Sequence, residues 1–340
     1  MIIDNRRKAL RHKKYMLLVF IWTLTVLSAP SISQSAVTVF KDYLFENPPA
    51  VVLSRLVPQK GCQTDSATGE LRILVFGDNG TGDENQLKVA GAMQKFCEKN
   101  GCDLALMLGD NIHPQGVRSA DDPQFVEKFE KPYEGLCIPF YAILGEHDWG
   151  RKDERYNWKA QVEYSQRSSR WRMPSDVYSL TIGDLKILAL NTNVLDSSPA
   201  QVDWLNKELG NSQARWNLVL GHKPIHSYGY HGDTDFMTAL VLPLLCGRAD
   251  LYLSAHEHNL QVLQADCGLP LLISGAGGKL RPEKETGPRS LFAAPELGFT
   301  YLQVKENVIL VQVVSAEGEI LYSSALPKQK RSDLKGAKEQ

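Results

Sequence analysis

The sequence lacks several features that mark particular classes of protein. Its 340 residues carry a formal net charge of only -1, so bulk electrostatics gives no reason to expect nucleic acid as a partner. It contains no internal repeat of the solenoid type. Its six cysteines include no C-x-x-C pair of the kind that binds zinc. With 43% hydrophobic residues, however, the chain can bury a large core.

Near the N-terminus, the apolar run is too short for an ordinary membrane span. Residues 15–27 form an apolar run of 13, against the roughly 20 that a spanning helix needs. A basic segment precedes this run, and a small polar stretch follows it. We therefore interpret residues 1–36 as an export signal, with an uncleaved membrane anchor as the alternative. The adjacent Arg6 and Arg7 also resemble a twin-arginine signal. The expected location is periplasmic, secreted, or membrane-anchored and facing out of the cytoplasm.

The cysteines fit an exported protein. All of them follow the expected signal, and their even number permits up to three disulfides. Cys246 and Cys267 flank a predicted hairpin and are the best candidate pair.

The rest of the chain is predicted to contain one large domain. Residues 37–70 show little periodicity and are interpreted as a lead-in segment. The domain extends over residues 71–327, and the charged tail 328–340 is expected to be disordered. In the last third, short strands with turn signals predict an antiparallel second sheet. A helix after Ser198 is predicted to start with a capping box completed by Gln201.

Two apolar runs end in the same short motif, Gly-Asp-Asn, and place Asp78 and Asp110 at the ends of predicted strands. The 32 positions between these aspartates suit one βαβ unit, and residues 89–97 carry the apolar spacing of its helix. The strands can then lie parallel, with both carboxylates at the same edge of a sheet. Because two neighbouring carboxylates repel each other, this arrangement predicts a metal ion between them.

Three further strand ends carry candidate ligands, and we expect them at the same edge. Together with the two aspartates, the candidates are Asp78, Asp110, His113, Glu146, His222, His256 and His258. Seven ligands are enough for two ions about 3.5 to 4 Å apart that share a carboxylate. Imidazole combined with carboxylate suits Zn, Fe or Mn rather than Ca.

The order of these motifs resembles that of the calcineurin-like metallophosphoesterases. The motifs are Gly-Asp-x-Gly, Gly-Asp-Asn, Gly-x-His-Asp, Gly-His and x-His-x-His, and residues 161–165, 256–261 and 274–277 are similar to the small tartrate-resistant purple acid phosphatases. The resemblance covers about residues 71–326. It implies an α/β fold, a four-layer α-β-β-α sandwich of two mixed sheets. It also implies that a bridging metal hydroxide at a dinuclear centre hydrolyses phosphate monoesters.

The resemblance also implies roles for individual residues. One metal would be held by Asp78, Asp110, His258 and the residue at 113; the other by Asp110, the residue at 146, His222 and His256. His147 and His231 match histidines that contact the substrate and can protonate the leaving group. His226 is interpreted as structural.

Two of the implied ligands differ from the family pattern. His113 stands where the purple enzymes have a tyrosine bound to ferric iron, and Glu146 stands where almost all have asparagine. The first change predicts that the protein is not purple, because the phenolate is the source of the colour. The total ligand charge is preserved but moves from the first metal to the second. We therefore expect a weaker preference for a trivalent ion at the first site, and either a divalent metal pair or a changed order of metal affinity.

Two other functions compete with phosphate monoester hydrolysis. The protein could be a catalytically weakened relative that binds phosphate compounds or a partner protein, because Glu146 changes the second metal position. It could also be a phosphodiesterase. The expected partner is a small phosphate ester, with no nucleic acid, and with membrane contact only through an uncleaved N-terminal segment.

Overall fold

The computed structural model describes residues 48–54, 70–150, 156–281 and 286–328. The chain divides into two compact units, Met1–Glu46 and Asn47–Gln340, and all of the described residues belong to the second. The expected export signal therefore lies outside the described residues, as does the charged tail except for its first residue. None of the helices in the described ranges combines the length and the apolar character that a bilayer span requires.

Two mixed β-sheets form the centre of the domain. Sheet A has the strand order β1-β6-β7-β8-β9-β11-β10-β12, and sheet B has the order β15-β14-β13-β2-β3-β4-β5. The strands of sheet A are β1 (Ala50–Leu53), β6 (Tyr178–Ile182), β7 (Leu185–Ala189), β8 (Trp216–Leu220), β9 (Leu251–Ser254), β10 (Leu260–Gln264), β11 (Pro270–Ser274) and β12 (Ser290–Ala294). Those of sheet B are β2 (Leu71–Phe76), β3 (Leu104–Met107), β4 (Phe140–Ala142), β5 (Trp171–Arg172), β13 (Gly298–Val304), β14 (Val308–Ser315) and β15 (Ile320–Pro327).

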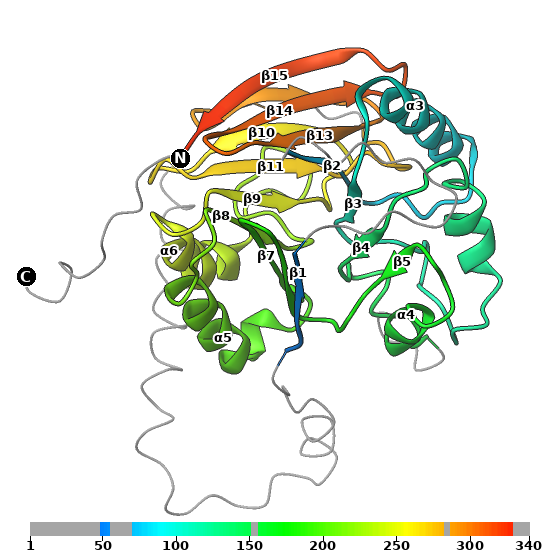
Figure 1. Cartoon of the computed structure of the whole chain (residues 1–340), viewed down its shortest axis with the longest axis horizontal. Helices are drawn as coiled ribbons and strands as arrows, with labels where there is room; N and C mark the ends of the chain where they lie inside the picture. Colours follow the sequence, from blue (N-terminus) through cyan, green and yellow to red (C-terminus); the bar gives the residue numbers. More distant parts are fainter. Residues whose placement is uncertain (1–47, 55–69, 151–155, 282–285, 329–340) are drawn as a thin grey trace, which may run out of the picture. The chain divides into compact units, whose positions relative to one another are not determined.

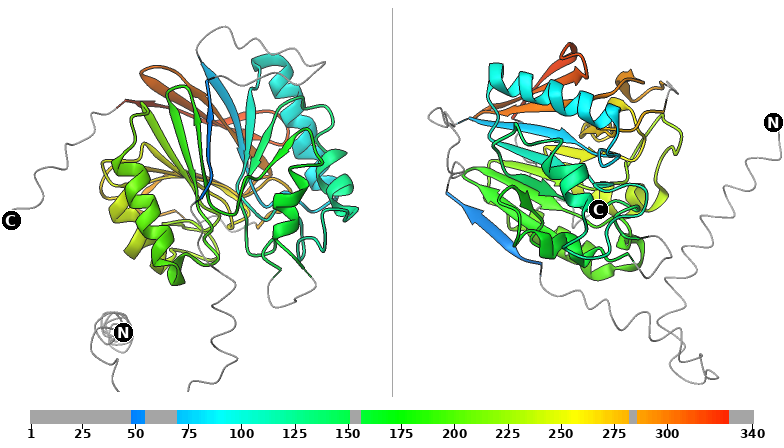
Figure 2. Two further views of the ribbon diagram at one scale, coloured as in Figure 1. Left: turned by 60° about the horizontal axis from the view of Figure 1, so that its bottom comes forward. Right: turned by 90° about the vertical axis from the view of Figure 1, so that its right-hand side faces the viewer.

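Helices cover the outer face of each sheet, which gives four layers (Figures 1 and 2). The α-helices are α3 (Glu84–Asn100) and α4 (Lys159–Tyr164) beside sheet B, and α5 (Pro199–Gly210) and α6 (Leu242–Leu245) beside sheet A. Shorter helical turns lie at Val126–Glu130, Leu195–Ser197 and Met237–Val241. The predicted α/β fold of two mixed sheets is confirmed.

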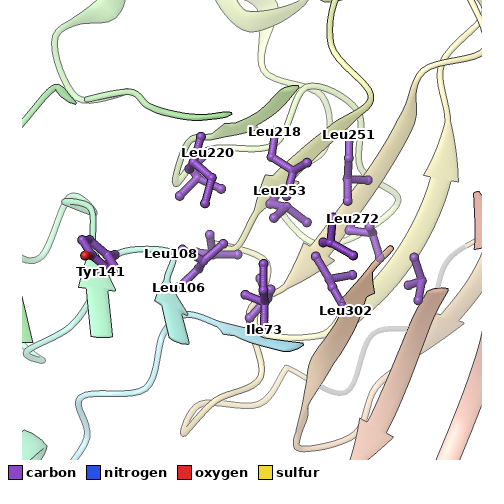
Figure 3. Packing of buried hydrophobic residues seen from close by; sticks show 14 of the residues in the cluster. Ile73, Leu106, Leu108, Tyr141, Leu218, Leu220, Leu251, Leu253, Leu272 and Leu302 are labelled. Carbon is purple, nitrogen blue, oxygen red and sulfur yellow. The ribbon is translucent and has the colours of Figure 1, made fainter. Parts of the chain in front are cut away.

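The alternation of side chains along the strands explains why the sheets stack. In β2, Ile73 and Val75 point into the cluster between the sheets, whereas Leu74 and Phe76 pack under α3. The strands β3, β8 and β9 alternate in the same way, so apolar residues cover both faces of each sheet. Figure 3 shows leucines of β8 and β9 facing Ile73 and Leu106 across this central layer.

Some strand placements differ from the sequence prediction. The strands of the last third do not form a separate sheet: β10 to β12 extend sheet A, and β13 to β15 extend sheet B. The lead-in segment contributes β1, which pairs in parallel with β6, so the fold begins before Leu71. Strand β1 has only four residues, too few to show a periodicity.

One predicted helix is present with a cap that was not predicted, and another lacks the cap that was predicted. The helix predicted around residues 89–97 is α3, where the side chain of Asp83 accepts hydrogen bonds from two backbone N–H groups of the first turn. The capping box predicted for α5 is wrong, because Ser198 makes no side-chain cap. Gln201 instead bonds the backbone of Asn191, with its Oε1 accepting and its Nε2 donating.

The predicted disulfide between Cys246 and Cys267 is confirmed, and a second links Cys97 to Cys102. Cys137 is disulfide-bonded as well. Disulfides persist in oxidising compartments, so these bonds indicate a protein outside the cytoplasm.

The two disulfides should differ in their contribution to stability. Opening the bond that spans 21 positions, with Cys246→Ala and Cys267→Ala, should lower the free energy of unfolding by about 3 kcal/mol. The corresponding pair at Cys97 and Cys102, which spans only 5 positions, should cost roughly 2 kcal/mol, because the shorter loop loses less entropy on closure. Urea unfolding measures both. The opposite order would contradict the loop-length explanation.

Candidate metal centre

Five strand-end loops meet at one end of the sandwich, and they come from both sheets. The loops after β2, β3 and β4 of sheet B carry Asp78, Asp110 and Glu146, and those after β8 and β9 of sheet A carry His222 and His256. The expectation of a single sheet edge is therefore wrong. The candidate ligands gather where the edges of two sheets converge.

Backbone hydrogen bonds join these loops directly. The N–H of Asp78 donates to the carbonyl of Gly109 at 3.0 Å, and the N–H of Ala255 donates to the carbonyl of His222 at 3.0 Å. Gly77 allows the two sheets to approach, because a Cβ atom there would lie 2.6 Å from the Cβ of Ala255. The positions of the candidate ligands are thus fixed by the backbone as well as by side-chain packing.

Four of the candidate ligands have a left-handed backbone conformation. They are Asp78 (φ 54°), Asp110 (φ 54°), His256 (φ 75°) and His258 (φ 53°), and no other non-glycine residue in the described ranges has a positive φ. This conformation is unfavourable for a residue with a Cβ atom, least so for aspartate. Such strain clusters at functional sites, where it aims a side chain that a relaxed backbone would direct elsewhere.

The first cluster of donors consists of Asp110, His113 and His147. The Nε2 atoms of the two imidazoles lie 3.8 Å and 3.7 Å from Oδ2 of the aspartate. The other aspartate oxygen, Oδ1, accepts a hydrogen bond from the N–H of His147 at 2.9 Å. The carboxylate is therefore held by one oxygen while the other points into the cluster.

The second cluster consists of Glu146, His222 and His256. Oε2 of the glutamate lies 2.9 Å from Nε2 of His222, and Oε1 lies 3.1 Å from Nδ1 of His256. His222 Nδ1 lies 2.8 Å from the carbonyl of Leu108, which can only accept, so this nitrogen carries a proton and Nε2 is the nitrogen that would bind an ion. His222 Nε2 also lies 3.7 Å from Asp110 Oδ1, which links the two clusters.

Asp78 and His258 complete the set of seven. Nε2 of His258 lies 3.2 Å from Oδ1 of Asp78, and Oδ2 of Asp78 accepts a hydrogen bond from the N–H of His256 at 2.7 Å. Asp78 also groups with Asp110 and His222 as possible donors to one ion. All seven residues that the sequence singled out as ligands are therefore brought together.

The donor atoms fit metal ions. Two donors that are each about 2.0–2.1 Å from one ion lie roughly 3 to 4 Å apart. The carboxylate-to-imidazole separations given above for the two clusters lie between 2.9 Å and 3.8 Å. Several of these atoms are buried and make no hydrogen bond: Asp78 Oδ1, Asp110 Oδ2, His113 Nε2, Glu146 Oε2 and His222 Nε2. Buried polar atoms without a partner are costly, and coordination would satisfy all five.

The pKa values of the three carboxylates among the candidate ligands shift in different directions. Burial raises the pKa of Asp110 well above its usual value; His222 opposes this effect, while Glu146 and Asp78 add to it. Burial would also raise the pKa of Asp78, but the close contact with His258 and the charge of this histidine lower it to about 2. The pKa of Glu146 is lowered as well, because its contacts with His222 and His256 outweigh its burial. Asp110 is thus the carboxylate with the least compensation from the protein.

The pKa values of the imidazoles also shift in different directions. Burial lowers the pKa of His113 to about 2, despite the opposing charge of Asp78, so His113 is neutral and can offer a lone pair. Burial also lowers the pKa of His222, but the charges of Asp110 and Glu146 outweigh it and raise the value well above the usual one. Without a metal ion, the two carboxylates therefore favour a second proton on His222, at Nε2, and a bound ion would take the place of that proton.

Of the two histidines predicted to contact substrate, His147 belongs to the first cluster of donors and His231 lies beside the second. His147 Nδ1 contacts the carbonyl of Pro114 and so carries a proton, which leaves Nε2 facing Asp110. The ring of His231 stacks on that of His256 at 4.1 Å between centroids. His231 Nε2 contacts the guanidinium of Arg281, which can only donate. His231 is therefore neutral, and burial lowers its pKa to about 4.

Two buried acids near the clusters were given no role from the sequence. Asp148 is fully buried and accepts hydrogen bonds from the N–H groups of Asn111 at 3.0 Å, Ile112 at 3.1 Å and Gly145 at 2.9 Å. It thereby ties the loop of Asp110 to that of Glu146. Its place in the Gly-x-His-Asp motif was the available signal.

The second of these acids, Glu257, lies between the ligand candidates His256 and His258. Its Oε2 accepts a hydrogen bond from the N–H of His231 at 3.0 Å, so it holds the loop that carries this histidine. His226 lies apart from the seven and contacts Asp233 at 2.7 Å.

Comparison with known proteins agrees with this geometry. The family model for calcineurin-like phosphoesterases matches residues 71–260. Tartrate-resistant acid phosphatase type 5 of Homo sapiens is 30% identical over 311 residues, which cover 78% of this chain and 94% of that protein. Purple acid phosphatase 4 of Arabidopsis thaliana is 32% identical over 297 residues, which cover 78% of this chain and 86% of that protein.

Solved structures share the fold. One is described as GAP50, the anchor in the inner membrane complex of Plasmodium, with a TM-score of 0.70, 24% identity and coverage of 78% of this chain and 91% of the other. Another is the purple acid phosphatase PPD1 of yellow lupin, with a TM-score of 0.60, 16% identity and coverage of 79% and 55%. Since the family model spans more than half of the chain and the acid phosphatases match most of it, the protein belongs to the calcineurin-like phosphoesterases, as a hydrolase related to the purple acid phosphatases.

Proposed function

We propose that the protein hydrolyses phosphate monoesters at a dinuclear metal centre. The observation that carries the proposal is the convergence of seven carboxylate and imidazole donors, of which five keep a buried ligand atom without a hydrogen bond. Phosphate esters are favoured because the relatives of high coverage are acid phosphatases. The Arabidopsis relative supports this independently of the mammalian ones.

The proposed ligand sets share Asp110. One ion would be held by Asp78, Asp110, His113 and His258, and the other by Asp110, Glu146, His222 and His256. Asp110 suits the bridging role, because its Oδ2 lies 3.8 Å from Nε2 of His113 and its Oδ1 lies 3.7 Å from Nε2 of His222. Its charge is also the least compensated. Two bound ions would activate water as the nucleophile and stabilise the charge that develops on the phosphoryl group.

The protein's own residues would position the substrate and handle the proton. His147 carries a proton on Nδ1, held by the carbonyl of Pro114, and presents Nε2 toward the clusters. In this orientation Nε2 faces the clusters, where it would bind or transfer a proton at a phosphoryl or leaving-group oxygen. His231 is in contact with Arg281 and would orient the substrate rather than act as the proton donor through Nε2.

The replacements His113 and Glu146 would favour a divalent pair of ions. His113 is neutral, so it contributes no negative charge to the first ion, whereas Glu146 adds one to the second. A trivalent ion at the first position would lose the anionic ligand that stabilises it. Iron, zinc and manganese all accept this donor set.

A second function is binding of a phosphate compound or a partner protein without turnover. Its support is the double contact of Glu146 with His222 and His256, which engages donors of the second ion within the protein itself. The structural relative from Plasmodium is described as an anchor.

We further propose that the protein is exported, as the disulfides suggest.

Activity distinguishes these two functions. The protein should hydrolyse a generic aryl phosphate when titrated with Mn²⁺, Zn²⁺ or Fe²⁺, at least about a thousandfold faster than Asp110→Ala, because the ions contribute several kcal/mol and each 1.36 kcal/mol is tenfold. A matched aryl diester tests the phosphodiesterase alternative. If no metal gives turnover above that of Asp110→Ala, the binding function replaces the hydrolytic one.

Metal binding should also be visible in stability, without any turnover. At 100 times its dissociation constant, a divalent ion should stabilise the wild-type protein by about 2.7 kcal/mol, and Asp110→Asn should remove most of this gain. The metal-free variant should be no less stable than the metal-free wild type. Asp110 has a raised pKa in the folded state, so its ionisation opposes folding at neutral pH, and asparagine tolerates the left-handed backbone.

Thermal unfolding with and without EDTA measures both effects. Asp203→Asn, an exposed carboxylate on α5, is the matched control and should respond to metal as the wild type does. A metal response in Asp110→Asn equal to that of the control would show that Asp110 is not a ligand.

The visible spectrum tests the tyrosine-to-histidine replacement. Iron-loaded wild-type protein should have no tyrosinate charge-transfer band, because His113 occupies the position of the phenolate. Iron-loaded His113→Tyr should acquire one. A tyrosinate band in the wild type, at one iron per chain, would refute the assignment of His113.

A further inference from the structure

The loop that follows β11 is fastened to the candidate metal centre at both ends. The N–H of Gly277 donates to the carbonyl of Gly77 at 3.1 Å, next to Asp78. The N–H of Arg281 donates to the carbonyl of His258 at 2.9 Å. Gly277 packs closely as well, because a Cβ atom there would lie 2.7 Å from the carbonyl oxygen of Gly77. The intervening residues are therefore held beside two of the candidate ligands.

Arg281 is oriented by aromatic side chains. Its guanidinium lies over the ring of Tyr230, 4.5 Å from the centroid, and its Nη1 donates to Nε2 of His231. Since the His231 ring stacks on His256, the guanidinium is one side chain away from a candidate ligand. A guanidinium has five N–H groups, and His231 engages only one of its nitrogens. Tyr230 is 67% exposed, so this face of the site is open to solvent.

Lys279 lies on the same loop, two residues before Arg281. Its positive charge contributes to the lowered pKa of His113. Neither Lys279 nor Arg281 forms an ion pair with a carboxylate in the ranges that the structure describes. The loop thus brings two uncompensated cations to the rim, one near each side of the clusters. Cations without carboxylate partners beside a phosphate site are suited to bind an anion.

The charge of the centre favours the same conclusion. The three carboxylates among the candidate ligands, Asp78, Asp110 and Glu146, nearly balance two divalent ions and leave one positive charge. A phosphate monoester dianion would by itself exceed this charge. With Lys279 and Arg281 included, the site could balance an anion with three negative charges.

We propose that Lys279 and Arg281 form a subsite for a second phosphate group of the substrate. The substrate class would then be a phosphate ester or anhydride in which another phosphate lies next to the one that is hydrolysed. Arg281 would bind this group with its free N–H groups while Tyr230 and His231 hold its plane, and Lys279 would add a second charge. This inference rests on the proposed function, because it places the first phosphate at the metal centre.

Binding of two non-hydrolysable probes tests the subsite. Isothermal titration calorimetry of the metal-loaded protein would compare inorganic phosphate with methylenediphosphonate. In Arg281→Gln, the preference for the diphosphonate, taken as the ratio of the two dissociation constants, should fall about tenfold, as expected for one lost charge-assisted hydrogen bond. Lys279→Gln should lower it a few-fold. Chelation of the ions by the diphosphonate is common to all variants, so only the change between variants counts.

Controls separate the subsite from general electrostatics and from the proposed function. Lys207→Gln, which removes an exposed charge on α5, should leave the preference unchanged. Metal content and circular dichroism are measured for every variant. An equal loss of affinity for both probes in Arg281→Gln and Lys279→Gln overturns the proposal, because the cations would then attract any anion. If the preference falls as expected while no metal gives turnover, the subsite stands and the hydrolytic function fails.

Discussion

The structure depends on gathering three carboxylates, two of them fully buried and one partly buried, where the edges of two sheets converge. Asp78, Asp110 and Glu146 come from three neighbouring strands of sheet B, and their mutual repulsion in a region of low dielectric must be offset by positive charge. Sheet A supplies imidazoles from the opposite side. The sandwich is thus organised so that negative charge from one sheet meets nitrogen ligands from the other. The imidazoles alone leave Asp110 with a raised pKa, and a metal ion would complete the compensation.

Holding these groups in place has a cost that the surrounding structure offsets. The left-handed backbone of Asp78, Asp110, His256 and His258 is unfavourable at each position. Against this, the apolar layer between the sheets runs up to the site through residues such as Leu108 and Ala255, both fully buried. Hydrogen bonds to buried acids add to this support. Asp148 gathers the N–H groups of two ligand loops, and an unpaired N–H in this region would be costly.

Much of this organisation could be read from the sequence, because strand ends leave a clear pattern. An apolar run that ends at Gly-Asp or Gly-His predicts a strand, and it also predicts that the candidate ligand lies at the C-terminal end of this strand. The division of the strands between two sheets could not be read in this way. The parallel strands β2 to β4 and β7 to β9 have the same apolar composition. The local sequence therefore does not indicate that the two sets belong to separate stacked sheets rather than to one sheet. The two-sheet arrangement came from the family resemblance.

Side-chain partnerships were harder to foresee than strands. Ser198 and Gln201 have the spacing of a capping box, but Gln201 can make two hydrogen bonds with the backbone of Asn191, and this tertiary contact prevails. Arg281 is separated from His231 by 50 positions, and its role arises only when the loop after β11 folds back over the site. Local spacing contains no information about such contacts.

The two departures from the family pattern are best understood together with this loop. In the proposed ligand sets, His113 in place of tyrosine and Glu146 in place of asparagine would move one negative charge toward the side of His222 and His256. That is the side on which His231 stacks on His256 and Arg281 donates to His231. A cation two side chains away from Glu146 offsets part of the relocated charge over a distance at which electrostatic effects persist in a buried site. Because Arg281 is fastened through its backbone to His258 and through its guanidinium to Tyr230, it keeps this position without engaging the carboxylate itself, and so remains available to an incoming anion.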